Sequence, residues 1–349
     1  MTPSRQLALV RPRRLVRGDW SAGCRLRLLW PLTSQYNPSV QLIRDITTLP
    51  DDLRGGALAI GNFDGVHRGH ARLVERLVAM ARRVGGPAVV FTFDPSPTKI
   101  LHPEMAPERL SWPERRAALL ARLGVDAMVA YPTDRALLTL TPETFFQQVV
   151  LDRLTARAMV EGSNFRFGRR RSGDIEQLQR LCTHAGLALE VVEPIELDGG
   201  TVSSSRIRAL LAEGQVDLAA ALLTEPYRIR GIVSSGSRRG ESLGYPTANV
   251  EQTLDTLALL PADGIYAGHA HVNKSQHPAA ISIGPNPTFH ENVRKIEVFL
   301  LDFQGNLYGQ PLEVDFISRL RDIVRFDSPE QLVAQMARDV EQTRRVLDR

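Results

Sequence analysis

Short apolar runs alternate with helix-like segments along the first part of the chain, beginning near Leu53. Between 71 and 83, apolar residues recur at helical spacing before two glycines. Further helices are expected from about 111 to 124, where Ser111 and Glu114 have the spacing of a capping box, from Thr141-Pro142 onward, and over about 174–185. Strands are expected, the first of them no earlier than Ala57, at Ala57–Ile60, Ala88–Phe93, Ala127–Tyr131, Ala158–Glu161 and Leu187–Val192. This β-α-β-α order predicts a parallel sheet covered by helices on both faces.

The pattern changes after Leu223, where Glu225-Pro226 interrupts the helical spacing. The following strands come without helices between them: Tyr227–Val233, Gly264–Val272, Ala279–Ile283, Ile296–Phe303 and Leu312–Phe316. An amphipathic helix over Glu330–Leu347 closes the chain. Successive strands followed by one helix predict a small antiparallel barrel. The expected organisation is therefore an extension over 1–39, an α/β domain over 40–223 and a barrel domain over 224–349.

Composition agrees with a globular protein of about two domains. The 349 residues are 43% hydrophobic and 23% charged, and no apolar run approaches the roughly 20 residues that a membrane helix requires. Cys24 and Cys182 are too few for a disulfide framework or a cysteine-rich metal site. These features predict a cytoplasmic protein that does not act in a membrane.

Positive charge is concentrated at the start of the chain. Residues 1–39 carry seven Arg against Asp19, a balance of +6, so the net charge of +4 leaves −2 for the remainder. A nucleic-acid partner is therefore not expected. The extension lacks an amphipathic pattern, so it is expected to be disordered or absent from the native protein. Val40, which a GTG start codon would encode when read internally, is the expected start; a transit peptide is the alternative.

The segment Gly61–His70 (GNFDGVHRGH) lies between the first strand and its helix, where α/β sheets bind ligands. Gly61 and Gly65 allow the backbone to approach a ligand closely. His67 and His70 are three residues apart at the helix start, and their imidazoles are suited to donating hydrogen bonds to phosphate oxygens. The alternatives are structural histidines or a metal site.

Two later segments follow strands at the same edge of the sheet. In Gly162–Gly168 (GSNFRFG), Phe165 and Phe167 could flank a planar ring or pack in the core. In Val202–Arg208 (VSSSRIR), hydroxyls and backbone N–H groups at a helix start, together with Arg206, could hold polyphosphate; a serine-rich helix cap is the alternative.

A second site is predicted in the barrel. Thr247 and Asn249 in GYPTAN face the same way in an extended segment, and their oxygens suit Mg²⁺. Gly236 and Gly240 in the preceding loop could wrap nucleotide phosphates, although this loop is no Walker-type P-loop. Glu297 shares a strand face with an aromatic residue and could be a general base; an exposed, paired carboxylate is the alternative.

These motifs, GNFDGVHRGH, NFRFG, SSSRIR, LGYPTAN, IGPNPTF, IEV and LRDxxxF, closely resemble bacterial bifunctional riboflavin kinase/FAD synthetases from about Gln41 to the end of the chain. The resemblance implies a Rossmann-like nucleotidyltransferase domain followed by a riboflavin kinase barrel. Its implied substrates and products are ATP, riboflavin, FMN and FAD, with Mg²⁺ as cofactor and transient flavin transfer to apo-flavoproteins. Implied catalytic residues are His67, His70, Arg206 and Glu297, and implied Mg²⁺ ligands are Thr247 and Asn249. Implied binding residues are Gly61, Asn62, Phe63, Asp64, Gly65, Asn164, Ser204, Ser205, Gly236, Gly240, Arg321 and Asp322.

The chain departs from the family pattern at several positions. Ser96 stands where His is usual, Ser205 replaces Thr, Phe299 replaces a frequent His, and Glu241 replaces a basic residue. Two rival functions remain: a pantetheine- or glycerophosphate-type nucleotidyltransferase with an unrelated barrel, and a flavin- or nucleic-acid-binding regulator. The first accounts for the paired histidines but not for PTAN or Glu297, and the charge balance argues against the nucleic-acid-binding version of the second.

Overall fold

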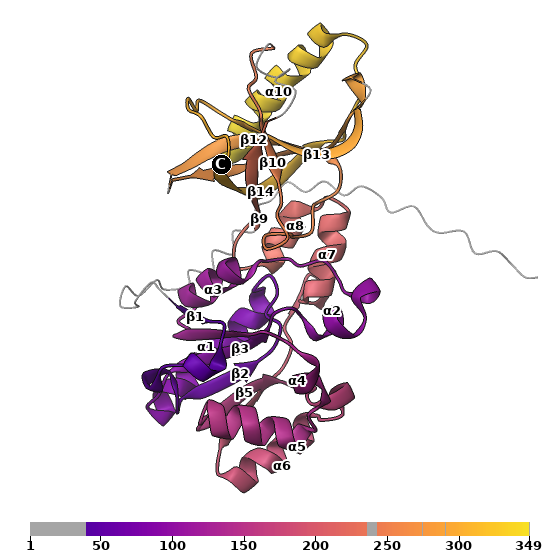
Figure 1. Ribbon diagram of the computed structural model, residues 1–349. Coiled ribbons are helices and arrows are strands. Elements are labelled where there is room, and N and C mark those ends of the chain that lie inside the picture. The colour runs from indigo at the N-terminus through magenta and orange to yellow at the C-terminus, as the bar shows by residue number, and fades with distance from the viewer. Residues whose placement is uncertain (1–39, 236–242, 274, 290, 349) are drawn as a thin grey trace, which may run out of the picture. The chain divides into compact units, whose positions relative to one another are not determined.

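The computed structural model describes residues 40–235, 243–273, 275–289 and 291–348 (Figure 1). The extension over 1–39 and the proposed phosphate-loop residues Gly236, Gly240 and Glu241 therefore lie outside the described residues. Residues Asn37–Arg349 form one compact unit. Within the described ranges, no helix has the length and apolar character needed to cross a membrane.

The first domain is built on a parallel sheet in the order β1-β4-β3-β2-β5-β6. Its strands are β1 Gln41–Ile43, β2 Ala57–Ile60, β3 Ala88–Phe93, β4 Ala127–Tyr131, β5 Ala158–Gly162 and β6 Ala188–Val192. The central strands β2 to β5 are almost wholly buried, as parallel strands covered on two faces are. The predicted parallel sheet is confirmed.

Alternate residues of these strands enter two separate cores, one on each face of the sheet. One core packs against α1 (Arg68–Val84) and α3 (Pro113–Arg122). The other packs against α5 (Pro142–Phe145), a π-helix (Phe146–Arg153) and α6 (Ile175–Ala185). Figure 1 shows these helices on either side of the sheet. Shorter helices complete the domain at α2 Pro97–Leu101 and α4 Arg135–Thr139.

Two local predictions were wrong. A strand precedes Ala57, because β1 pairs in parallel with β4 at the edge of the sheet; three partly exposed residues give no periodic signal. Ser111 and Glu114 form no capping box, because α3 begins after Trp112 and has no side-chain cap. The Ser111 hydroxyl is instead bonded to Asp64, and Glu114 pairs with Arg44.

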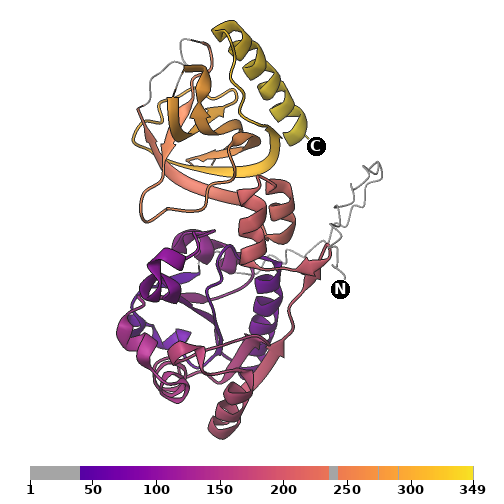
Figure 2. The ribbon, with the colours of Figure 1, turned by 90° about the vertical axis from the view of Figure 1, so that its right-hand side faces the viewer.

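The second domain is a closed antiparallel barrel in the order β10-β13-β12-β11-β14-β9. Its strands are β9 Tyr227–Ser234, β10 Ala248–Glu251, β11 Gly264–Val272, β12 Ser275–Asn286, β13 Glu291–Leu300 and β14 Pro311–Arg321. The helix α10 (Pro329–Leu347) lies along the barrel against β11, β12 and β14 (Figures 1 and 2). The barrel and its closing helix are confirmed; β10 was expected only as an extended segment.

Two helices link the domains and pack on the barrel. A short hairpin, β7 Glu196–Leu197 and β8 Gly200–Thr201, leads into α7 (Ser204–Ala212) and α8 (Val216–Leu222). Apolar residues of both helices share one core with the barrel interior. The Ala262 N–H of the barrel also donates to the Leu211 carbonyl of α7, at 2.9 Å. The core of the barrel therefore extends across residue 223.

Candidate active sites

The glycine-rich turn after β2 holds its backbone in uncommon conformations. Gly65 has φ 80°, and a Cβ there would lie 3.0 Å from Leu110 Cδ1. Phe63 and Val66 also have positive φ, 47° and 42°, although neither residue favours that region. Such strain persists only where surrounding contacts enforce it, so the turn is held rigidly.

The two histidines of the turn stack on each other. Their ring centroids lie 3.6 Å apart with 13° between the planes, and Phe63 lies 5.0 Å from the ring of His70. His67 is the N-cap of α1, because its Nδ1 accepts from the His70 backbone N–H at 3.2 Å. An imidazole that accepts at Nδ1 carries its proton at Nε2 when neutral, so Nε2–H of His67 remains a donor.

Both imidazoles are neutral near pH 7. Burial lowers the pKa of His67 to about 4, against a partial offset by Asp64. Burial, followed by the neighbouring His67, also lowers the pKa of His70 well below its usual range. Within the described part of the chain, His70 Nδ1 is buried and has no hydrogen-bond partner. Each ring therefore offers hydrogen bonding to a ligand without carrying charge.

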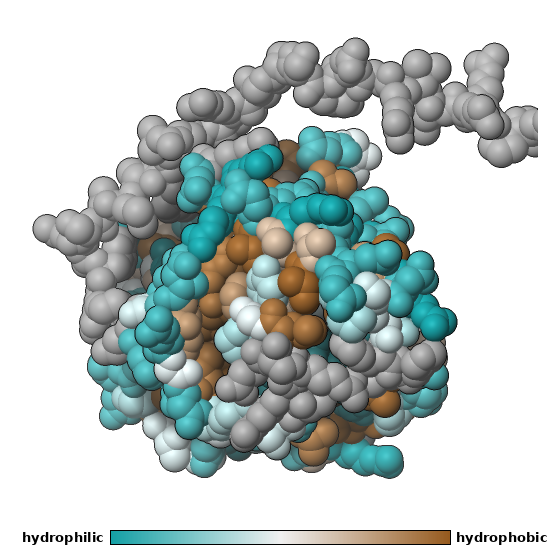
Figure 3. Space-filling model, turned by 90° about the horizontal axis from the view of Figure 1, so that it is seen from above, coloured by the Kyte–Doolittle hydropathy of each residue, from teal (hydrophilic) through white to brown (hydrophobic). Residues whose placement is uncertain are grey.

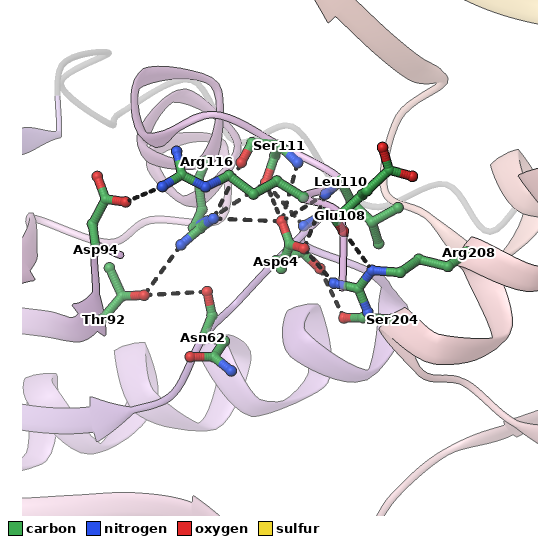
Figure 4. Close-up of polar contacts among 12 residues, drawn as sticks. Asn62, Asp64, Thr92, Asp94, Glu108, Leu110, Ser111, Arg116, Ser204 and Arg208 are labelled. Carbon is green, nitrogen blue, oxygen red and sulfur yellow. Dashed lines mark hydrogen bonds and ion pairs between the residues drawn. The ribbon is translucent and has the colours of Figure 1, made fainter. Parts of the chain in front are cut away.

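Asp64 anchors the turn to two distant segments (Figure 4). Its buried carboxylate accepts from the backbone N–H groups of Leu110 and Ser111 and from the Ser111 hydroxyl. It also pairs with Arg208 of α7 at 2.6 Å and with Arg116 of α3 at 3.4 Å. With its oxygens so occupied, this carboxylate positions the turn.

The start of α7 contacts the same turn. Ser204 Oγ donates to the Asp64 carbonyl at 2.9 Å. Ser204 lies one helical turn before Arg208, which pairs with the Asp64 carboxylate. The Ser203 hydroxyl caps the helix, whereas Ser205 is exposed. Arg206 donates to the Leu197 and Gly200 carbonyls of the hairpin at 2.7 and 2.8 Å. Sequence analysis assigned no role to Arg208, although its i,i+4 spacing from Ser204 was a usable signal.

Gly61 follows strand β2, and Gly162 ends the neighbouring strand β5. The two glycine-containing segments therefore start at one edge of the sheet. Asn62 and Asn164 are exposed there. Phe165 and Phe167 stack on each other at 5.4 Å, and Phe167 is buried in the core. The position of Phe167 is therefore explained by core packing and not by contact with a planar ring of a ligand.

The barrel holds a cavity of about 170 Å³. Thr247, Asn249, Glu297 and Arg321 all line it, together with apolar side chains from the barrel and α10. Figure 3 shows hydrophobic surface gathered in a hollow of the face seen from above, which is the barrel end of Figure 1. A pocket with an apolar wall and few polar groups is typical of a small-molecule site.

The polar side of this cavity is set by strand pairing. Asn249 of β10 and Ser282 of β12 are the register partners of Glu297 on either side of β13. The neighbouring Ile296 and Val298 are buried, so the predicted alternation along this strand is confirmed.

Helix α10 is fastened to the rim of the cavity. Arg321 donates to both carboxylate oxygens of Asp339, at 2.9 and 2.7 Å, and its guanidinium carbon lies 5.9 Å from the Phe326 ring centroid. Asp339 lines the cavity and was missed by sequence analysis, because only the fold brings it to Arg321. Asp322 is exposed, pairs with Arg319 at 3.0 Å and does not line the cavity.

A parallel α/β sheet with a glycine-rich turn at the strand ends, followed by a barrel with a mostly apolar cavity, defines a two-domain enzyme of the nucleotide-using class. The family model of FAD synthetase matches residues 49–206, and that of riboflavin kinase matches residues 223–347. The chain belongs to the bifunctional riboflavin kinase/FMN adenylyltransferase family, and it is an enzyme with both of those activities. The barrel match rules out a nucleotidyltransferase with an unrelated second domain.

Relatives cover nearly all of the described chain. A bifunctional riboflavin kinase/FMN adenylyltransferase of Pseudomonas fluorescens is 37% identical over 302 residues, 86% of this chain and 96% of the relative. That of Escherichia coli (strain K12) is 34% identical with the same coverage. A crystal structure described as a macrolide-efflux protein from Streptococcus pneumoniae is 32% identical, with a TM-score of 0.77, covering 87% of this chain and 98% of its own.

Proposed function

We propose that each activity is confined to one domain. The barrel, residues 224–349, transfers the γ-phosphoryl group of ATP to riboflavin and releases FMN and ADP. The α/β domain, residues 40–223, joins the FMN phosphate to the α-phosphorus of a second ATP, giving FAD and pyrophosphate. The ranges matched by the two family models, 49–206 and 223–347, support this division.

In the adenylyl-transfer site, the neutral donors of the glycine-rich turn act on ATP phosphates. We propose that His67 Nε2–H and the His70 ring hydrogen-bond to phosphate oxygens as negative charge develops. Gly61, Asn62, Phe63 and Gly65 shape the backbone around the nucleotide, and Asp64 holds that backbone through the contacts to α3 and α7.

Residues outside the turn complete this site. Ser204, Ser205 and Asn164 lie at the same edge and are proposed to seat ATP and FMN. Arg206 reaches the phosphates by exchanging its bonds to the hairpin carbonyls for charge-assisted bonds to ATP. Ser96, which stands where the family usually has His, is the N-cap residue of α2 and makes no side-chain cap bond.

In the kinase site, Glu297 is proposed as the general base that takes the proton from the ribityl hydroxyl as this attacks the γ-phosphorus. The observation that carries this assignment is that Glu297 and Asn249 are register partners in the wall of one cavity. Arg321, held by Asp339, is proposed to border the flavin. Asp322 contributes to that rim through its carbonyl, which accepts from Arg321 at 2.9 Å, while its carboxylate pairs with Arg319.

Thr247 and Asn249 would hold Mg²⁺ in this cavity. Among the described residues no cluster of three or more His, Cys, Asp or Glu could bind a metal, so an all-protein cage is not available in those ranges. A hydroxyl and an amide oxygen still fit Mg²⁺, which keeps several waters and shares phosphate oxygens. The ion would supply charge neutralisation on the ATP phosphates, while the two side chains orient them toward Glu297.

The partners proposed are small molecules, namely ATP, riboflavin and FMN, with transient transfer of flavin to apo-flavoproteins. Neither nucleic acid nor a membrane is proposed as a partner, because the charge outside residues 1–39 sums to −2. The proposed compartment is the cytoplasm, where Cys182, buried and unpaired, would remain reduced.

The test is direct. Purified protein is incubated with riboflavin, ATP and Mg²⁺, and the flavins are separated by chromatography over time. FMN should accumulate before FAD, and chelation of Mg²⁺ should stop the first step. Conversion of added FMN to FAD without any formation of FMN from riboflavin would contradict the kinase assignment.

A further inference from the structure

The two segments proposed to bind substrate in the α/β domain begin on adjacent strands. The glycine-rich turn follows Ile60 of β2, and the GSNFRFG segment begins with Gly162, the last residue of β5. Chain order along the sheet reverses between β2 and β5, since β3 and β4 lie on one side and β6 on the other. Ligands of open α/β sheets bind at such a reversal.

Strands β2 and β5 separate before they reach this edge. Their pairing stops at Leu58 and Met159, although β2 stays paired with β3 as far as Ile60 and β5 stays paired with β6 as far as Gly162. Because the strands diverge, the Ile60 N–H has no backbone partner on β5. The carboxyl of Glu161 occupies the gap, and its Oε1 accepts from the Ile60 N–H at 2.8 Å.

We propose that Glu161 is a positioning residue for adenylyl transfer, whose side chain spans the opening between β2 and β5 and sets the spacing of the two substrate-binding segments. Its hydrogen bond joins the last β2 residue before the glycine-rich turn to the residue immediately before Gly162. The side chain is 1% exposed, so water does not compete for this bond. The proposal rests on the assignment of adenylyl transfer to this domain.

Glu161 acts through its shape and its acceptor oxygen, not through charge. Burial raises the pKa of its carboxyl well above the ordinary range, and the Ile60 N–H offsets this only in part. The titratable neighbour Cys182, from α6, is also neutral, because burial raises its pKa to about 12. A glutamine has the same length and an acceptor oxygen, so it preserves the contact; a valine leaves the Ile60 N–H buried without an acceptor.

The experiment compares Glu161→Gln with Glu161→Val in the full chain. An unsatisfied buried N–H costs enough to shift the strands, so Glu161→Val should raise the KM for ATP in FAD formation by about tenfold or more. Glu161→Gln should restore that KM to within about threefold of the parent protein. Riboflavin phosphorylation, measured in the same samples, should be unchanged in both, and Glu176→Val, on the exposed face of α6, serves as the matched control.

Two results would overturn the proposal. One is an unchanged KM for ATP in Glu161→Val. The other is a KM for ATP raised by about tenfold or more in Glu161→Gln, which would show that the charge of Glu161 is required. Because this KM is compared with that of the parent protein, the result is decisive even if the valine variant does not fold. If His70→Ala leaves FAD formation intact, the assignment of adenylyl transfer to this domain fails instead. If His70→Ala abolishes FAD formation while Glu161→Val does not alter it, only the positioning role fails.

Discussion

Asn249 and Glu297 are directly paired residues of neighbouring strands, β10 and β13, and both line the barrel cavity. Antiparallel register places paired side chains on the same face within about 5.5 Å between Cβ atoms. The group proposed to orient the ATP phosphates and the group proposed to deprotonate the acceptor are thereby held by one short stretch of sheet. If these roles hold, riboflavin phosphorylation should depend on single barrel side chains and not on the first domain.

Replacing Glu297 with glutamine should therefore remove the proposed base while keeping its shape. We expect the kcat for riboflavin phosphorylation to fall by about 10²- to 10⁴-fold, the usual contribution of general base catalysis. Added FMN should still be converted to FAD at the parent rate. The measurement is the chromatographic rate of each step; loss of both steps in folded protein would argue against separate sites.

His70→Ala should have the opposite effect. Removing a donor aimed at developing phosphate charge should slow FAD formation by about 100-fold or more, with FMN formation intact. The exposed His102 provides a control, because His102→Ala removes an imidazole without touching the stacked pair. A similar loss of FAD formation in both variants would show that the effect does not depend on the stacked pair of imidazoles.

The barrel should work without the α/β sheet. Residues 224–349 contain Thr247, Asn249 and Glu297, and we expect this fragment to retain riboflavin kinase activity. A fragment starting at Ser203 should melt at a higher temperature, because it keeps α7 and α8 on the barrel and each fully buried leucine contributes about 2 kcal/mol. Thermal melts of the two fragments test the difference in stability. If the longer fragment has no kinase activity, the kinase site lies between the domains.

Acidification should destabilise the α/β domain through His67. Folding lowers its pKa from 6.5 to about 4, so between these values the unfolded chain binds more protons and the free energy of unfolding decreases as the pH falls. The contribution of His67 to the free energy of unfolding, about 3 kcal/mol, is fully present above the unfolded pKa of 6.5. It is lost as the pH falls toward the folded pKa of about 4.

His67→Asn isolates this effect. Asparagine is also a good helix N-cap, so the variant keeps a cap but loses the titrating ring. Its melting temperature should fall less than that of the parent protein between about pH 7 and about pH 5. The variant also lacks the His67 contribution that lowers the pKa of His70, and this change further weakens its pH dependence. Equal pH dependence would contradict the neutral, buried state of His67.

The central strands were predictable because burial on both faces leaves a continuous apolar run, as in Ala88–Phe93. Edge strand β1 was not, since its pairing to β4 leaves no mark in a three-residue sequence. The roles of Asp64 and Arg206 show a second limit. Both belong to recognisable motifs, but their hydrogen-bond partners lie on segments that only the fold brings close, as at Leu110 and Gly200.

The core that α7 and α8 share with the barrel bears on how such a gene can divide during evolution. A kinase that became a separate gene would lose stability if it began after α8, unless polar residues replaced the barrel side chains that the two helices cover. Gene fission is therefore expected to cut before α7, although the change from alternating helices and strands to successive strands comes only at Tyr227.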